Sequence, residues 1–292
     1  MKNIKLSGGL LVFLGALCWS LNSPLIKFIE VDALFTCGFR SLIAGIALLP
    51  FLRVKKLNWS PWILVYLSAY CGLCIAIVMA LRQTSAAIAI GMQYGSVIWL
   101  FLVSVIASKK LDTKRLLPVV LITAGVVVFM LSGMHGTSMT GNLIALTESF
   151  FFALMTVGAK KCAGDNPLGL TALANLFTGF VVFAFMPPQL TDCLSLTGLE
   201  WTIMLILGVF QLGMGYALYN MGVRKTTPQK AAVIAIWEMI LGPVWVALFL
   251  HEYPTLLVCI GFVIIIAGLF LDAKLDPSEE IKEETKLELE SH

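Results

Sequence analysis

The feature that most constrains this chain is a series of apolar segments, each about 20 residues long, that recurs along its whole length. A helix of about 20 apolar residues crosses the roughly 30 Å hydrocarbon core of a bilayer. Because 59% of the residues are hydrophobic and only 13% are charged, a soluble fold of this size could not hide so much apolar surface. The sequence therefore predicts an all-α, multi-pass integral membrane protein.

Ten transmembrane helices fit the hydropathy, with breakers and charges between them. We expect spans over residues 7–27, 33–52, 62–82, 86–107, 116–132, 141–160, 168–187, 202–222, 229–250 and 255–272.

The distribution of Lys and Arg predicts the orientation, since cytoplasmic loops carry an excess of both. With a cytoplasmic N-terminus, the inside receives 14 basic residues and the outside receives two, Lys27 and Arg82. We therefore expect both termini in the cytoplasm. The inside residues are Lys2, Lys5, Arg53, Lys55, Lys56, Lys109, Lys110, Lys114, Arg115, Lys160, Lys161, Arg224, Lys225 and Lys230.

The two halves of the chain resemble each other. The stretch 8–27 aligns with 141–160, so that Gly8 matches Gly141 and Lys27 matches Lys160. Five spans per half is an odd number, so the second half must enter the membrane from the opposite side. Such inverted repeats are typical of alternating-access transporters, whose substrate site lies near the bilayer midplane. We expect one repeat over 1–134, a second over 135–272 and an acidic cytoplasmic tail over 273–292.

Residues 221–271 contain an ordered set of motifs that resembles the second repeat of EamA-type transporters, in the drug/metabolite transporter superfamily. The set comprises Arg224-x-Thr226, a small-residue helix, Glu238 with Pro243, the turn Glu252-x-Pro254 and Ala267-Gly268 in the last span. The resemblance covers nearly the whole chain and implies ten helices in two repeats. It departs from the family pattern at Met239, which replaces a proline, and at Val97 and Lys110.

Three charged residues, Arg40, Glu148 and Glu238, lie well inside predicted spans. A charge at the bilayer centre costs about 2.5–3.5 kcal/mol on insertion scales. Such side chains must therefore face a protein interior or a water-filled cavity.

Glu238 is the first candidate for substrate binding and coupling. Gly242 leaves room one turn away, and Pro243 lacks the N–H that would bind the Met239 carbonyl. Burial disfavours the charged form of a carboxyl group, so Glu238 is a candidate for binding a proton or cation. The alternative is a structural role, either as a protonated acid or in a Glu–Arg pair.

Glu148 lies beside Phe151 and one turn from Phe152, where a carboxylate and aromatic rings could hold an organic cation. Helix packing is the alternative role. We expect Arg40 to pair with Glu148, and binding a substrate carboxylate is its alternative.

Neutral polar residues mark further candidate faces. Gln211, Gly215 and Tyr219 recur every fourth residue on the eighth span. Gln93 lies within a Gly91-x-x-x-Gly95 motif, which more often marks close helix packing. The resemblance places the first span, with Trp19 and Asn22, beside the central cavity. The substrate-binding candidates are thus Trp19, Asn22, Gln93, Glu148, Gln211, Tyr219 and Glu238, with Glu238 and Glu148 also for coupling and Arg40 and Pro243 for charge pairing or structure.

The sequence predicts a secondary active transporter of the cell membrane (the inner membrane in a bacterium) that moves a small polar or amphipathic metabolite. Two buried acids against one Arg favour cationic or zwitterionic solutes such as amino acids and amines. Export follows from the resemblance, and proton coupling from Glu238. The alternative is a lipid-carrier flippase or a non-transporting membrane partner.

No motif indicates an enzyme, a metal site, a cofactor or nucleic-acid binding. The partners expected are a small-molecule substrate and membrane lipids, and either a monomer or a homodimer fits the sequence.

Overall fold

The computed structural model describes residues 6–132, 138–162, 166–185, 192–226 and 228–275. These residues form helices joined by short connections, and no strand occurs among them. Among the described residues, ten helical segments are long and apolar enough to cross a membrane, which confirms the ten predicted spans. The acidic tail after Leu275 lies outside the described residues.

Seven α-helices and three short 3-10 helices are described for the first five spans and their connections. They comprise α1 (Gly8–Ser20), α2 (Asn22–Phe28), α3 (Ala33–Leu48) with η1 (Leu49–Phe51), η2 (Val54–Lys56), α4 (Trp62–Gln83), α5 (Ala86–Gln93), α6 (Ser96–Ser108), η3 (Thr113–Arg115) and α7 (Leu116–Ser132).

The second five spans follow the same order. They comprise α8 (Met139–Cys162), α9 (Pro167–Phe185), the short α10 (Asp192–Ser195), α11 (Gly198–Ile206), the π-helix η5 (Leu207–Met214), α12 (Gly215–Val223), α13 (Pro228–Leu250) and α14 (Leu256–Lys274).

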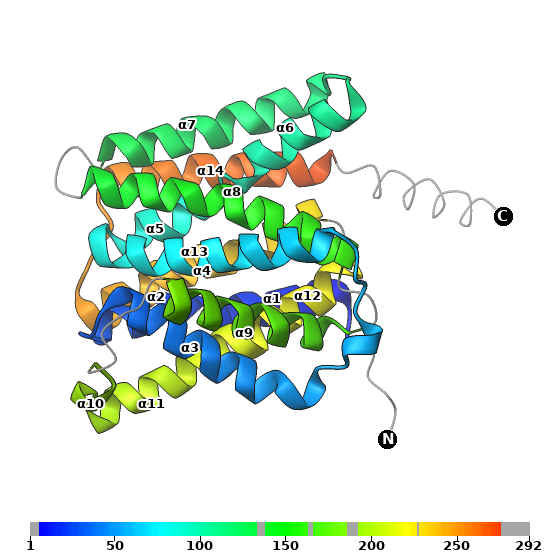
Figure 1. Ribbon diagram of the computed structural model, residues 1–292. Coiled ribbons are helices and arrows are strands. Elements are labelled where there is room, and N and C mark those ends of the chain that lie inside the picture. Colours follow the sequence, from blue (N-terminus) through cyan, green and yellow to red (C-terminus); the bar gives the residue numbers. More distant parts are fainter. Residues whose placement is uncertain (1–5, 133–137, 163–165, 186–191, 227, 276–292) are drawn as a thin grey trace.

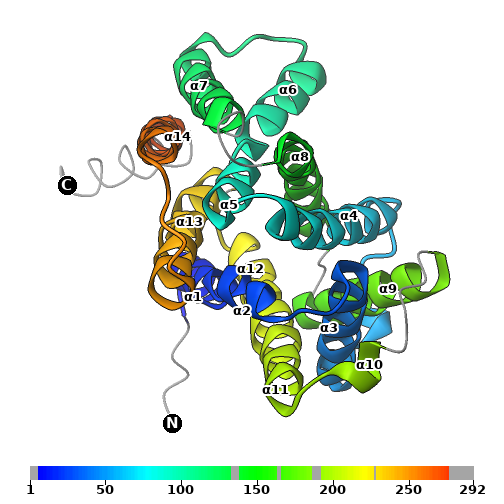
Figure 2. The same cartoon turned by 90° about the vertical axis from the view of Figure 1, so that its left-hand side faces the viewer.

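The spans run roughly along one direction, and the two halves interlock rather than sit apart (Figures 1 and 2). Helix α1 packs on α12 and α13, and its counterpart α8 packs on α4 and α5. In the same way α3 packs on α9, and α7 packs on α14. Each contact between the halves therefore has a counterpart with the roles exchanged, as a duplicated sequence with opposite orientation requires.

The aligned glycines Gly8 and Gly141 show this exchange in detail. A Cβ on Gly8 would lie 2.8 Å from the Cβ of Lys225, and one on Gly141 would lie 2.8 Å from the main-chain carbon of Gln83. Gly8 therefore lies at the start of the first span and packs on the end of the eighth span, which is the third span of the second half. Gly141 lies at the start of the sixth span, the first of the second half, and packs on the end of the third span. Only a residue without a Cβ allows so close an approach.

Three spans are interrupted near the middle of the bundle. The first breaks at Leu21, where Pro24 cannot supply the N–H of a continuous helix. The fourth breaks at Tyr94 and Gly95, and the eighth contains the π-helix η5. Helix α13 continues through Pro243, because a transmembrane helix tolerates a proline where neighbouring helices pack around it. The predicted disruption at Pro243 is therefore limited to the N–H that proline lacks.

Candidate functional site

The three charged residues predicted inside the membrane are all buried. Their exposed fractions are 1% for Arg40, 0% for Glu148 and 5% for Glu238. Each lies seven or more residues from the ends of its helix, on α3, α8 and α13 respectively. Such side chains need partners inside the protein, because a lone buried charge is unfavourable.

Arg40 is held by neutral groups. Its Nη1 donates to Asn22 Oδ1 at 2.6 Å and to Gln211 Oε1 at 3.2 Å, while its Nε has no acceptor within the described part of the chain. The expected pairing with Glu148 is therefore wrong for this conformation. Arg40 contacts the break between α1 and α2 and the π-helix η5, and these bring two amides to it instead.

Glu148 lies on the face of α8 that points to the centre of the bundle. Phe152, one turn along, contacts Trp19, and Thr156, two turns along, shares a hydrogen bond of 3.2 Å with the hydroxyl of Tyr219. Neither carboxyl oxygen of Glu148 has a hydrogen-bond partner among the residues described. A fully buried acid without partners is the kind of group that a ligand can satisfy.

Residues at the break in the fourth span bind Glu238 and its helix. Gln93 Nε2 donates to Glu238 Oε2 at 3.3 Å, and the hydroxyl of Tyr94 donates to the carbonyl of Ala235, one turn earlier on α13. Helix α5, which carries Gln93, packs on both α8 and α13. The two predicted carboxyl groups therefore lie on helices that adjoin the same broken span.

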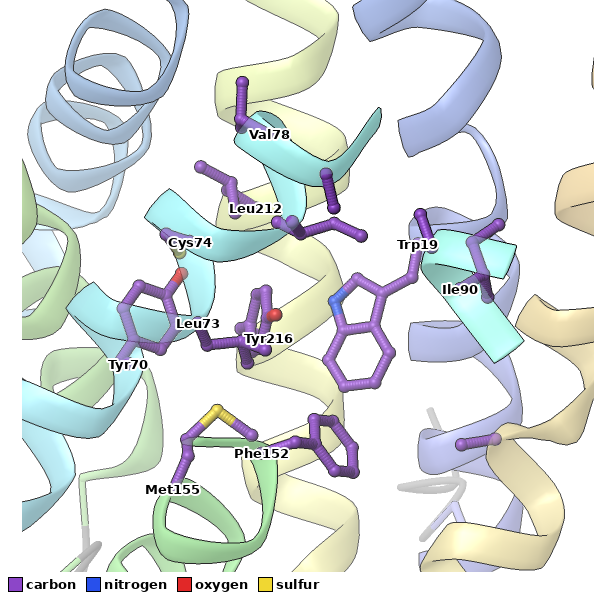
Figure 3. Close-up of a cluster of buried hydrophobic side chains, with 14 of the residues drawn as sticks. Trp19, Tyr70, Leu73, Cys74, Val78, Ile90, Phe152, Met155, Leu212 and Tyr216 are labelled. Carbon is purple, nitrogen blue, oxygen red and sulfur yellow. The ribbon is translucent and has the colours of Figure 1, made fainter. Parts of the chain in front are cut away.

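Figure 3 shows a cluster of buried side chains that includes the aromatic rings of Trp19, Tyr70, Phe152 and Tyr216. The ring of Trp19 lies 4.5 Å from that of Tyr216, 4.7 Å from that of Tyr219 and 6.2 Å from that of Phe152, centroid to centroid. Trp19 is 2% exposed, and its Nε1 has no acceptor within the described ranges. Tyr70 extends the cluster through Tyr216. Aromatic faces of this kind attract organic cations and stack on planar groups.

The structure brings six of the seven substrate-binding candidates into direct contacts with other site residues. Asn22 and Gln211 bind Arg40, Gln93 binds Glu238, and the Trp19 and Tyr219 rings contact each other. The seventh, Glu148, lies one turn from Phe152 of the same aromatic cluster.

Sequence reasoning missed Tyr216 as a member of the site. The regular spacing of Gln211, Gly215 and Tyr219 leaves out Tyr216, but the π-helix η5 ends just before it. The Tyr216 ring contacts Trp19, and its centroid lies 4.7 Å from that of its other neighbour, Tyr70. The adjacent Gly215 is the sequence feature that could have identified Tyr216. A Cβ there would lie 2.8 Å from the Trp19 ring.

Comparison with known proteins supports a membrane carrier. The model of the EamA-like transporter family matches residues 6–131 and again residues 139–272. The uncharacterized transporter YvbV of Bacillus subtilis (strain 168) is 26% identical over 284 residues, which cover 90% of each chain. YxfA of Lactococcus lactis subsp. lactis (strain IL1403), whose name assigns it provisionally to sugar uptake, is 28% identical over 153 residues, or 50% of each chain.

The fold also has a counterpart among solved structures. One crystal structure superposes with a TM-score of 0.67 at 17% sequence identity, over 94% of this chain and 98% of that one. At this identity the likeness concerns the fold alone.

Proposed function

Because the chain belongs to the EamA-like transporter family, which matches both of its halves, we propose that it moves a cationic or zwitterionic metabolite, such as an amine or amino acid, by alternating access. It is a transporter of the multi-pass membrane class and not an enzyme. The observation that carries the proposal is the pair of buried acids, Glu148 and Glu238, beside the aromatic cluster around Trp19.

In this proposal Glu148 and Glu238 hold the positive group of the substrate, and the aromatic rings hold its body. Glu238 also carries the proton. Its carboxyl group is buried and accepts a hydrogen bond from the amide of Gln93. Since burial disfavours the charged form of a carboxyl group, Glu238 holds a proton while the site is empty, and binding a cation favours release of that proton. Exchange of substrate for protons follows, and with an inward proton gradient its direction is export.

The orientation and division of the chain complete the proposal. We place both termini in the cytoplasm and the protein in the cell membrane, as the distribution of Lys and Arg favours. We assign residues 1–134 and 135–272 to the two repeats and 273–292 to a cytoplasmic tail.

The test is proton flux in proteoliposomes that contain a pH-sensitive dye, with amines, amino acids and nucleosides offered in turn. Wild type is compared with Glu238→Gln and Glu148→Gln. The control is Glu30→Gln, which removes an exposed carboxyl group from the connection between α2 and α3. We expect a substrate to drive proton movement in wild type and in the control, and Glu238→Gln to abolish it. Equal substrate movement in Glu238→Gln without a proton signal would make Glu238 structural and the protein a uniporter or exchanger.

Sugar uptake is a second candidate, drawn from the name of YxfA. Aromatic faces and neutral amides suit a sugar ring, and Trp19, Asn22 and Gln211 offer both. Labelled monosaccharides offered to the same proteoliposomes distinguish the two. Sugar uptake that both Glu→Gln variants leave intact would favour this second function over the first.

A further inference from the structure

The charge of Arg40 has no counter-ion in the described structure. Its hydrogen bonds go to amide oxygens, the three ion pairs identified lie elsewhere, and Nε has no acceptor. A carboxylic acid can escape the cost of burial by taking up a proton, but arginine in proteins does not lose its charge. The position of Arg40 is therefore explained best if an anionic group joins it in the working protein.

Other buried polar groups near the aromatic cluster also have no partner. Trp19 Nε1 and both oxygens of Glu148 have no hydrogen-bond partner within the described residues. Buried polar groups in folded proteins are rarely left unpaired, so these groups, together with Arg40, indicate a polar ligand in this region.

Both charged residues adjoin the aromatic cluster. Arg40 binds Asn22, three residues after Trp19, and Gln211, five residues before Tyr216. Glu148 lies one turn from Phe152, which contacts the Trp19 ring. Arg40 and Glu148 are not bonded to each other within the described residues.

We propose that the substrate is a zwitterion whose carboxylate binds Arg40, whose ammonium binds Glu148, and whose apolar body lies against Trp19. This inference rests on the proposed function and narrows its substrate class. A simple amine would leave Arg40 without a counter-ion. A simple acid would serve Arg40 but would leave the two buried oxygens of Glu148 without a hydrogen-bond donor. A molecule that carries both charges satisfies both residues. The guanidinium of Arg40 suits a carboxylate because it offers several donors in one plane.

The experiment compares molecules that share a skeleton and differ only in charge. Tryptophan, tryptamine and indole-3-propionate form one set, and leucine, 3-methylbutylamine and 4-methylpentanoate form another. Labelled uptake of each is measured in proteoliposomes against empty liposomes. In wild type we expect the zwitterion of at least one set to be taken up with an affinity at least tenfold higher than that of its amine or its acid.

The variants then assign the two ends. In Arg40→Gln we expect the loss of affinity for the zwitterion to exceed the loss of affinity for the amine at least tenfold. In Glu148→Gln we expect uptake of both the zwitterion and the amine to be lost. Lys27→Gln is the charge control, since Lys27 pairs with Glu252 at the end of the bundle. If Arg40→Gln takes up none of the probes, the losses for zwitterion and amine are compared in Arg40→Lys instead, together with the preference of the wild type.

The outcomes separate the inference from the function on which it rests. Equal wild-type affinity for amine and zwitterion, or equal losses for both in Arg40→Gln, would overturn the zwitterion inference and leave cation transport standing. No uptake of any amine or zwitterion by wild type would overturn the proposed function and the inference with it.

Discussion

Replacing Glu148 with leucine should stabilise the protein while abolishing its transport. Both carboxyl oxygens are fully buried and have no partner in the described ranges. An unsatisfied buried group costs about 1–3 kcal/mol, and apolar replacement of buried charged groups has stabilised proteins by about 1–4 kcal/mol. Since leucine is apolar and of similar size, we expect Glu148→Leu to gain about 1–4 kcal/mol.

The measurement is thermal unfolding of the detergent-solubilised protein, followed by tryptophan fluorescence. At about 2 °C per kcal/mol for a chain of this length, the expected rise in Tm is about 2–8 °C. Substrate uptake by the same variant should fall to the level of empty liposomes. Gain of stability with loss of activity is the signature of a residue kept for function rather than for packing.

Glu238→Leu is the matched control. Glu238 accepts a hydrogen bond from Gln93, so its removal leaves a buried amide donor without that acceptor. We expect no gain in Tm, or a loss, in this variant. If Glu148→Leu lowers Tm, or if the two variants behave alike, then Glu148 is satisfied in the native protein and the argument from its unpartnered oxygens fails.

Two further changes probe the packing around the site. In Gly15→Ala the new Cβ would lie 2.9 Å from the carbonyl oxygen of Gly215, so α1 and α12 must separate. Denaturant unfolding should show that the free energy of unfolding falls by about 1–3 kcal/mol. In the control Gly198→Ala the new Cβ meets nothing within 4 Å, and the free energy of unfolding should not fall. Glu252→Gln breaks the partly exposed pair with Lys27 and should cost less than about 1 kcal/mol; a loss above about 2 kcal/mol would contradict a solvent-screened pair.

The number and approximate limits of the spans follow from the sequence because lipid makes them a local property. Within hydrocarbon each segment must satisfy its own backbone hydrogen bonds, so every crossing is a helix whose length and hydropathy are visible in the residues. The same reasoning identifies Arg40, Glu148 and Glu238 as functional candidates, since each is costly wherever it lies in the membrane. The match of Gly8 with Gly141 likewise needs no coordinates.

The partners of those residues are not a local property. Arg40 binds Gln211, 171 positions away, instead of the acid that charge alone would choose. Gln93 meets Glu238 across 145 positions. Hydropathy sets where a helix crosses but not how it is turned about its axis, and the break at Leu21 and the π-helix before Gly215 change that rotation. The sequence alone therefore determined which residues are costly to bury. Only the packing of the helices decided that Arg40 meets two amides and that neither Arg40 nor Glu148 has a counter-ion in the described structure.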